Sequence, residues 1–177
     1  MEVEVAEVIN MQDIDWEKVW LQRYEERERL QQRENGIDDW DIAAEDFSFS
    51  HKTNNYEYGR KVRDALGEAL NSDSKVMEIG PGPGTFVIPF ASKVGKITAV
   101  EPSKGMIKEL TKNAKEAGIE NFEVINKVWE DIDDSEIARR YDLVVCSSVL
   151  WMFKDVWKQL RRIEKASNGY LYPPVQI

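Results

Sequence analysis

The residues with the clearest chemical potential are a short glycine-rich turn and one acid downstream of it. The turn, Gly80-Pro81-Gly82-Pro83-Gly84, directly follows the apolar run Val76-Met77-Glu78-Ile79. Glu101 comes seventeen residues after Gly84, at the end of a second apolar run. Glycine lacks a Cβ and reaches positive φ at little cost, so such a turn brings bare backbone close to a ligand. An acid about 20 residues further on is where a carboxylate that binds ribose hydroxyls is expected. Together they predict a site for a nucleoside-containing cofactor.

The spacing of the glycines separates the cofactors that such a turn could bind. A dinucleotide-binding turn reads G-x-G-x-x-G, and Thr85 stands where its last glycine would be. Pro81 and Pro83 also remove two backbone N–H groups that a pyrophosphate would use. No G-K-S or G-K-T follows the turn, which excludes a Walker-type phosphate loop. An adenosyl ligand without phosphates fits better, and a nicotinamide oxidoreductase is disfavoured.

Three segments, in this order, resemble the first, second and fourth motifs of class I S-adenosylmethionine-dependent methyltransferases. They are Glu78-Ile79-Gly80-Pro81-Gly82-Pro83-Gly84, Ala99-Val100-Glu101-Pro102-Ser103 and Tyr141-Asp142-Leu143-Val144-Val145-Cys146-Ser147-Ser148. The likeness covers residues 54–172 and is greatest to small archaeal-type members of the family. It implies a doubly wound, mainly parallel α/β sheet of the Rossmann-like methyltransferase fold. It also implies an enzyme that uses S-adenosylmethionine, releases S-adenosylhomocysteine and transfers a methyl group by in-line displacement.

The same resemblance implies roles for residues at the carboxyl ends of the expected strands. The glycines hold the methionine and ribose part of the cofactor, and Glu101 binds the ribose as an otherwise unpaired acid. Glu78 orients the turn or the cofactor's amino group, or is purely structural. The family binds adenine after the third strand through a backbone N–H and a carboxylate, which points to Trp129, Glu130 and Asp131; either acid could supply the carboxylate. The cofactor site is therefore expected to comprise Glu78, Gly80, Pro81, Gly82, Gly84, Glu101, Pro102, Trp129, Glu130 and Ser147.

Motifs that are absent narrow the acceptor, although no catalytic base can be assigned. Ser147 and Ser148 should face the transferred methyl group, but the Asn/Asp-Pro-Pro-Tyr/Phe motif of amino-methylating nucleic-acid enzymes does not occur there. Cys146 follows Val145 rather than the proline of cytosine-methylating enzymes, so a buried small residue is favoured over a reactive thiol. His51, the only histidine, is favoured as an exposed or capping residue over a general base. The sequence has no cluster of His and Cys residues, so a metal site is not expected. A small molecule or a protein is the favoured acceptor, and nucleic acid is disfavoured.

Alternating apolar runs and amphipathic stretches predict the elements that position these residues. Strands are expected at 76–79, 97–100, 122–125 and 143–146, and a fifth begins at Tyr170. Helical faces are expected between Tyr58 and Leu70, after the glycine turn with Pro89 in the first turn, from an N-cap at Ser103 to Gly118, and from Val156 to Ile163. Strands that alternate with helices predict a parallel, doubly wound sheet.

The first fifty residues predict a helical extension ahead of this sheet. Trp16, Val19, Trp20 and Tyr24 recur at helical spacing, and packing against the core or a partner is favoured over substrate contact. Residues 1–50 contain 15 acidic and five basic residues, whereas residues 51–177 are nearly balanced. An acidic leader disfavours a phosphate-rich partner. We expect a helical extension at 1–50 and an S-adenosylmethionine-binding domain at 51–177.

Composition and the chain's end complete the expectations. A single cysteine excludes a disulfide framework, and no secretory signal or membrane-spanning run is present, so a cytoplasmic protein is expected. Family members usually continue beyond the fifth strand with a helix and an antiparallel strand pair, whereas this sequence stops at Ile177. Without these last strands the sheet has an open edge, so either the chain is a truncated form, or a second copy or a partner covers that edge. A non-catalytic association module is therefore the alternative to an enzyme.

Overall fold

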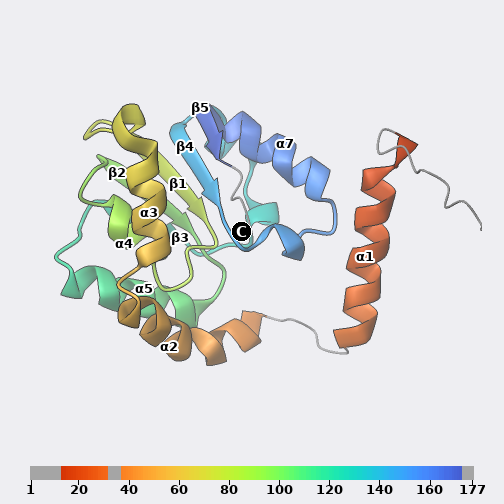
Figure 1. The fold of residues 1–177 in the computed structure, drawn as a ribbon, viewed down its shortest axis with the longest axis horizontal. Helices are drawn as coiled ribbons and strands as arrows, with labels where there is room; N and C mark the ends of the chain where they lie inside the picture. Colours follow the sequence, from red (N-terminus) through yellow and green to blue (C-terminus); the bar gives the residue numbers. More distant parts are fainter. Residues whose placement is uncertain (1–12, 32–36, 173–177) are drawn as a thin grey trace, which may run out of the picture.

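A five-stranded parallel sheet forms the centre of the computed structural model, which describes residues 13–31 and 37–172 (Figure 1). The strands lie in the order β3-β2-β1-β4-β5, and every neighbouring pair is parallel. Their bounds are β1 (Lys75–Ile79), β2 (Lys96–Val100), β3 (Phe122–Ile125), β4 (Tyr141–Cys146) and β5 (Ser167–Tyr172). After an exposed first lysine, β1 and β2 are buried throughout, as expected for strands covered on both faces.

Helices cover both faces of the sheet, which makes the fold doubly wound. One face packs against α3 (Glu57–Leu66), α4 (Val87–Phe90) and α5 (Lys104–Glu116), around Phe86, Phe90 and Leu110. The other face packs against α6 (Asp134–Ile137) and α7 (Val156–Ala166), around Ile137 and Ile163. Short 3-10 turns η2 (Gly67–Ala69), η3 (Trp129–Asp131) and η4 (Leu150–Met152) complete the described elements. The chain changes face between β1 and β4, and ligands of such sheets bind at the carboxyl ends of the strands at this point.

The structure confirms the predicted fold class and most of the predicted elements. Ser103 caps α5 by accepting a hydrogen bond from the Met106 amide, and Gly118 follows that helix with φ +67°. β4 begins two residues earlier than predicted and β5 three residues earlier. The helix after the glycine turn is only four residues long. The segment Asp38-Asp39-Trp40-Asp41, whose sequence indicates a turn or a new helix start, lies in the first turns of helix α2 (Ile37–Thr53).

The N-terminal helices contact the sheet layers at two places. Helix α2 packs along α5, and its Ala44 and Ser48 are buried there. In α1 (Trp16–Gln31), Trp20 Nε1 donates a hydrogen bond to the Phe153 carbonyl at 3.0 Å. Packing of the aromatic stripe against the core is thus confirmed for Trp20, whereas Trp16 is 46% exposed. The sequence also predicts that this helix ends at Gly36, a position outside the described residues.

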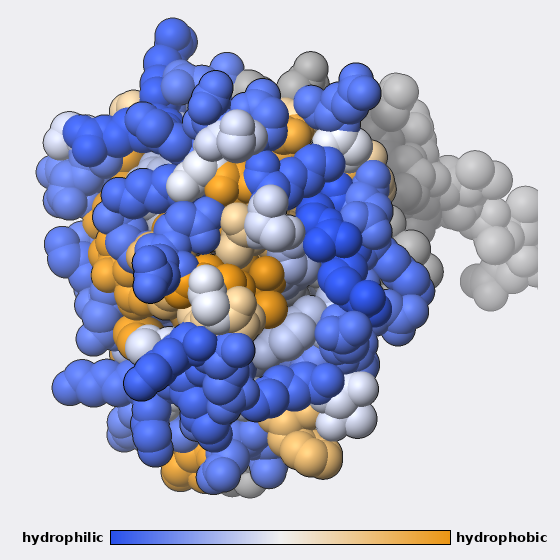
Figure 2. All heavy atoms as spheres, turned by 90° about the vertical axis from the view of Figure 1, so that its left-hand side faces the viewer, coloured by the Kyte–Doolittle hydropathy of each residue, from blue (hydrophilic) through white to orange (hydrophobic). Residues whose placement is uncertain are grey.

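The predicted open edge of the sheet is β5. It pairs with β4 and with no other strand in the part of the chain that the structure describes. The Pro173-Pro174 segment that follows lies outside the described residues. Hydrophilic side chains cover most of the face shown in Figure 2, and apolar side chains emerge between them near its middle. Within residues 13–31 and 37–172, no helix combines the length and the apolar character needed to cross a bilayer.

Candidate functional site

The glycine turn follows β1 and presents its backbone at the carboxyl edge of the sheet. Gly80, Gly82 and Gly84 have φ values of +68°, +53° and +111°. A Cβ on Gly80 would collide with the side chain of Val149, and one on Gly84 would lie 2.8 Å from Ile88 Cγ1. A Cβ on Gly82 would meet only Met106 Sδ, at 3.8 Å. Packing therefore requires glycine at positions 80 and 84, whereas Gly82 faces space that a ligand could use.

Glu101 lies next to this turn at the end of β2. Its Oε2 accepts a hydrogen bond from the Gly82 amide at 3.1 Å, and its Oε1 accepts one from the Ser103 amide at 3.0 Å. The expectation of an unpaired acid is therefore wrong, because two backbone amides hold the carboxylate. Burial raises the pKa of Glu101 above its ordinary value, although the two amides lower it. Each carboxylate oxygen keeps a lone pair for a further donor such as a ribose hydroxyl.

Glu78 supports the turn from beneath. The side chain is 2% exposed, and its two oxygens accept hydrogen bonds from the amides of Phe86 and Val87, at 3.2 and 2.9 Å. These amides begin α4, so Glu78 fixes the far end of the glycine turn. Burial raises the pKa of Glu78 to about 8, against the opposing effect of the two amides. Of the roles left open by the sequence, this geometry favours orientation of the turn.

A second support of the turn was not predicted from the sequence. Asn113 Nδ2 donates to the Pro83 carbonyl and to Ser48 Oγ, both at 3.0 Å. Asn113 is 3% exposed and lies on the buried face of α5. A polar residue on the apolar stripe of a predicted helix was the signal that could have revealed it.

Two polar pairs flank the turn where the predicted methyl-transfer region lies. Thr85 Oγ1 is 3.0 Å from His51 Nε2, and His51 Nδ1 is 2.8 Å from the Phe47 carbonyl. Since a carbonyl only accepts, Nδ1 carries the proton and Nε2 accepts from the threonine hydroxyl. Ser147 Oγ is 3.3 Å from the Tyr58 hydroxyl, and Tyr58 as a residue is 43% exposed. His51 and Tyr58 thus border the turn, and sequence reasoning had not placed Tyr58 there.

The residues expected to bind adenine form the short turn η3 after β3. The Trp129 side chain is 2% exposed and packs in the core under the Arg162 guanidinium, 4.9 Å from its ring centroid. The Trp129 side chain is therefore part of the core, and only the backbone of this residue is left for the expected contact with adenine; Glu130 and Asp131 are exposed. Cys146 is buried as predicted, and burial raises the pKa of its thiol to about 12. A thiol in this state is a packing residue rather than a nucleophile.

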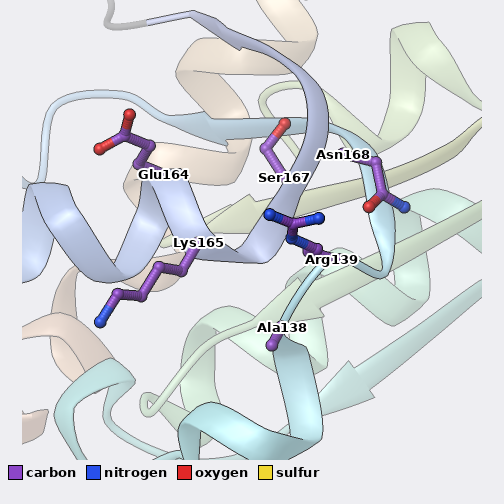
Figure 3. Close-up of a pocket in the computed structure, with 6 residues that line it drawn as sticks. All are labelled: Ala138, Arg139, Glu164, Lys165, Ser167 and Asn168. Atoms are coloured by element: carbon purple, nitrogen blue, oxygen red, sulfur yellow. The ribbon is translucent and has the colours of Figure 1, made fainter.

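A separate hollow of about 570 Å³ lies at the opposite edge of the sheet (Figure 3). It is lined by Ala138, Arg139, Glu164, Lys165, Ser167 and Asn168. The first two precede β4, the next two end α7, and Ser167 and Asn168 begin β5, so the hollow opens at the amino ends of the strands. This hollow is distinct from the space beside Gly82 at the carboxyl ends of the strands. Among the described residues, no group of three or more His, Cys, Asp or Glu side chains could hold a metal ion.

The residues at the carboxyl edge fit an adenosyl ligand. Gly80, Gly82 and Gly84 bring backbone to the surface, and Gly82 leaves room where any side chain would project. Glu101 supplies a fixed carboxylate beside that room. The structure brings together the predicted Glu78, the glycines, Glu101 and the adjoining Pro102. Ser147 follows β4 at the same edge and contacts the Tyr58 hydroxyl, whereas the Trp129 side chain lies in the core.

Comparisons with known proteins agree with this geometry. A family model described as a methyltransferase domain matches residues 49–172. The 23S rRNA (uracil(1939)-C(5))-methyltransferase RlmD of Alcanivorax borkumensis is 28% identical over 134 residues, which are 72% of this chain and 28% of that protein. A putative S-adenosylmethionine-dependent methyltransferase of Methanococcus maripaludis has a similar solved fold, with a TM-score of 0.66 and 20% identity over 79% of this chain and 64% of that one. The S-adenosylhomocysteine-bound N-terminal domain of EvdMO1 also has a similar fold, with a TM-score of 0.57 and 22% identity over 64% of this chain and 48% of that one. The chain spans well under half the length of the curated relatives it matches.

Proposed function

This chain belongs to the class I S-adenosylmethionine-dependent methyltransferases, and on that premise we propose that it binds S-adenosylmethionine and transfers its methyl group. The observation that carries the proposal is the Glu101 carboxylate, held beside Gly82 at the carboxyl end of β2. The turn at Gly80, Gly82 and Gly84 would hold the methionine and ribose part. Glu101 would accept the ribose hydroxyls, with Pro102 beside it. Glu130 or Asp131 would reach adenine.

The protein's own contribution to such a reaction is alignment and exclusion of water. S-adenosylmethionine supplies a methyl group that its sulfonium charge already activates for in-line displacement. Glu78 and Asn113 hold the two ends of the glycine turn, so that the cradle is formed before a ligand arrives. Ser147 and Tyr58 would face the acceptor beside it. A base is needed only for an acceptor that arrives protonated, and the His51 imidazole, whose Nε2 lies 3.0 Å from Thr85 Oγ1, borders the described site.

We propose a small molecule or a protein side chain as the acceptor. The relative RlmD is named for a ribosomal RNA uracil, but the segment shared with it covers only 28% of that protein. In this chain Cys146 is buried, follows Val145 and has a raised pKa, which argues against the Pro-Cys nucleophile of the cytosine enzymes. The acidic first fifty residues argue against a phosphate backbone as partner. We also propose that the protein is cytoplasmic, where small-molecule and protein acceptors are both available.

The acceptor can be tested with S-adenosylmethionine that carries a radioactive methyl group. Protein, RNA and small-molecule fractions of a lysate are offered separately, and label above that given by Glu101→Ala identifies the acceptor class. We expect label in the metabolite or protein fraction. Label confined to RNA would overturn the acceptor proposal while supporting methyl transfer.

Association is a second candidate role that two observations favour. In the described part of the chain, β5 pairs with β4 and with no other strand, and α1 exposes apolar side chains, including Trp16 at 46% and Leu30 at 72%. Unpaired strand edges and apolar patches are typical of surfaces that bind another chain. Light scattering tests this role. A monomer over a wide concentration range would reject self-association, and a partner protein would then be sought by cross-linking.

A further inference from the structure

Helix α2 reaches the carboxyl end of β2 through a single carboxylate. Asp41 Oδ1 accepts hydrogen bonds from the Ser103 hydroxyl at 2.5 Å and from the Gly105 amide at 2.7 Å. Ser103 donates its own amide to Glu101 Oε1, and Gly82 donates to Glu101 Oε2. A continuous chain of hydrogen bonds therefore runs from the N-terminal segment to the acid and the glycine turn.

The backbone is shaped for this contact. A Cβ on Gly105 would lie 2.7 Å from both the Cα and the carbonyl oxygen of Asp41, so only glycine lets α2 approach this closely. Ser103 is 1% exposed, and its Oγ also accepts from the Met106 amide at 3.0 Å. Since the Ser103 hydroxyl donates to Asp41 while it accepts from Met106, its orientation is fixed from both sides.

Electrostatics alone does not explain why Asp41 lies here. The nearby charge of Asp41 contributes to the raised pKa of Glu101, because two carboxylates disfavour each other's ionisation. The hydrogen bonds from Ser103 and Gly105 lower the pKa of Asp41, so this acid stays charged. The charge of Asp41 thus disfavours ionisation of Glu101, the proposed ribose-binding acid. Its position is explained if the hydrogen bond from Ser103 serves to hold Glu101 in place.

We propose that Asp41 is a positioning residue for the cofactor: it fixes Ser103, whose amide holds the Glu101 carboxylate in the orientation that binds the ribose hydroxyls. The inference rests on the proposed function of Glu101. It makes α2 part of the cofactor site, although α2 begins outside the region that the methyltransferase family model matches. A merely structural Asp41 would stabilise the contact between α2 and α5 without affecting how the site distinguishes ligands.

The test measures ligand discrimination by calorimetry on the full chain. S-adenosylhomocysteine and its 2′,3′-dideoxy analogue are titrated into the wild type, Asp41→Ala and Asp41→Asn. Asp39→Ala is the matched control, because Asp39 lies on the same helix and is exposed. The wild type and Asp39→Ala should prefer the hydroxylated ligand by about tenfold or more, which corresponds to about 1.4 kcal/mol. Asp41→Ala should lose most of this preference while binding the dideoxy analogue nearly as well as the wild type.

The Asn variant separates the hydrogen bonds from the charge. Both bonds end on Oδ1, so the amide oxygen of Asp41→Asn can accept both, and near-wild-type discrimination is expected. Ser103→Ala should reproduce Asp41→Ala, and the double variant should be no worse than either single one. Equal weakening of both ligands by Asp41→Ala would overturn the inference and leave the proposed function standing. Absence of wild-type binding to S-adenosylhomocysteine would instead overturn the proposed function, and the inference with it.

Discussion

Glu78 shows how a single buried acid can support the turn of the proposed cofactor site. Its carboxylate satisfies two amides that begin α4, and a buried amide without a partner costs about 1–3 kcal/mol. Burial nevertheless favours the protonated form, and the pKa rises to about 8 from an ordinary value of 4.5. The acid thus binds a proton more tightly in the folded than in the unfolded protein.

This shift predicts a pH-dependent stability. The contribution of Glu78 is full below about pH 4.5 and is lost as the pH rises through about 8, because the unfolded chain releases this proton first. The unfolding free energy of Glu78→Gln should therefore fall less than that of the wild type between about pH 5 and pH 8.5, by about 4 kcal/mol. Urea unfolding at the two pH values measures this. Equal losses in both proteins would show that Glu78 does not carry the shift.

Gly82 should separate ligand binding from stability. Gly82→Ala places a methyl group where only Met106 Sδ lies within 4 Å, so the variant should fold with a cost of about 1 kcal/mol for its positive φ. Gly118→Ala is the matched control, because it has φ +67° and an open surrounding at the far end of α5. Both variants should lose similar stability in thermal unfolding, but only Gly82→Ala should weaken S-adenosylhomocysteine binding. Wild-type affinity in Gly82→Ala would show that the ligand does not approach this glycine.

The sequence indicated those candidate-site residues that lie within recognisable sequence motifs. The glycines and Glu101 were found because a turn and a strand end at fixed spacing have a fixed geometry. Asp41 and Tyr58 were not found, since they come from helices whose position over the sheet depends on tertiary packing. The paired state of Glu101 was also missed, because its amide partners are backbone groups that no residue type reveals.

At the scale of the element, α1 is held by few contacts. Trp20 donates to the Phe153 carbonyl, and Arg27 stacks 4.8 Å from the ring centroids of both Tyr24 and Trp151. These residues place α1 against the segment that follows β4 and η4. The helix therefore lies near the proposed acceptor side of the site without belonging to the sheet's core layers.

Trp20→Phe should loosen this helix. The variant keeps an aromatic ring but removes the N–H donor to Phe153, at an expected cost of about 1 kcal/mol. Amide hydrogen exchange should become faster in α1 and stay unchanged in β1 and β2. Trp16→Phe is the control, since Trp16 is 46% exposed and its change should alter little. Unchanged exchange in Trp20→Phe would show that this hydrogen bond does not hold α1.

Element types were predictable because alternation of buried strands with amphipathic helices is written in the spacing of apolar residues. Boundaries were less predictable: β4 starts at Tyr141 because Tyr141 pairs with Ser167 of β5, ahead of the apolar run that begins at Leu143. The four-residue α4 ends where Ala91 and its neighbours turn toward β2, which the apolar pattern alone did not indicate. The division into an extension at 1–50 and a domain at 51–177 stays a prediction, with α2 spanning its boundary.

For the whole molecule, the parallel sheet and its change of face determine where the site lies. The order β3-β2-β1-β4-β5 puts the turn after β1 between the ends of β2 and β4. Glu101 and Ser147 follow those two strands, and so both lie beside the turn. This juxtaposition follows from topology, which is why family motifs predicted it while the packing of α1 and α2 over it was not predictable.

The most direct test of the account is S-adenosylhomocysteine binding to Glu101→Gln. The amide cannot match a carboxylate that accepts from Gly82, Ser103 and a ribose, so affinity should fall by about tenfold or more relative to the wild type. Glu109→Gln, a change at another buried acid, on α5, should bind like the wild type. Calorimetry on the three folded proteins decides the matter. Binding that is equal in the wild type and Glu101→Gln, or no binding to the folded wild type, would contradict the assignment of this edge as the cofactor site.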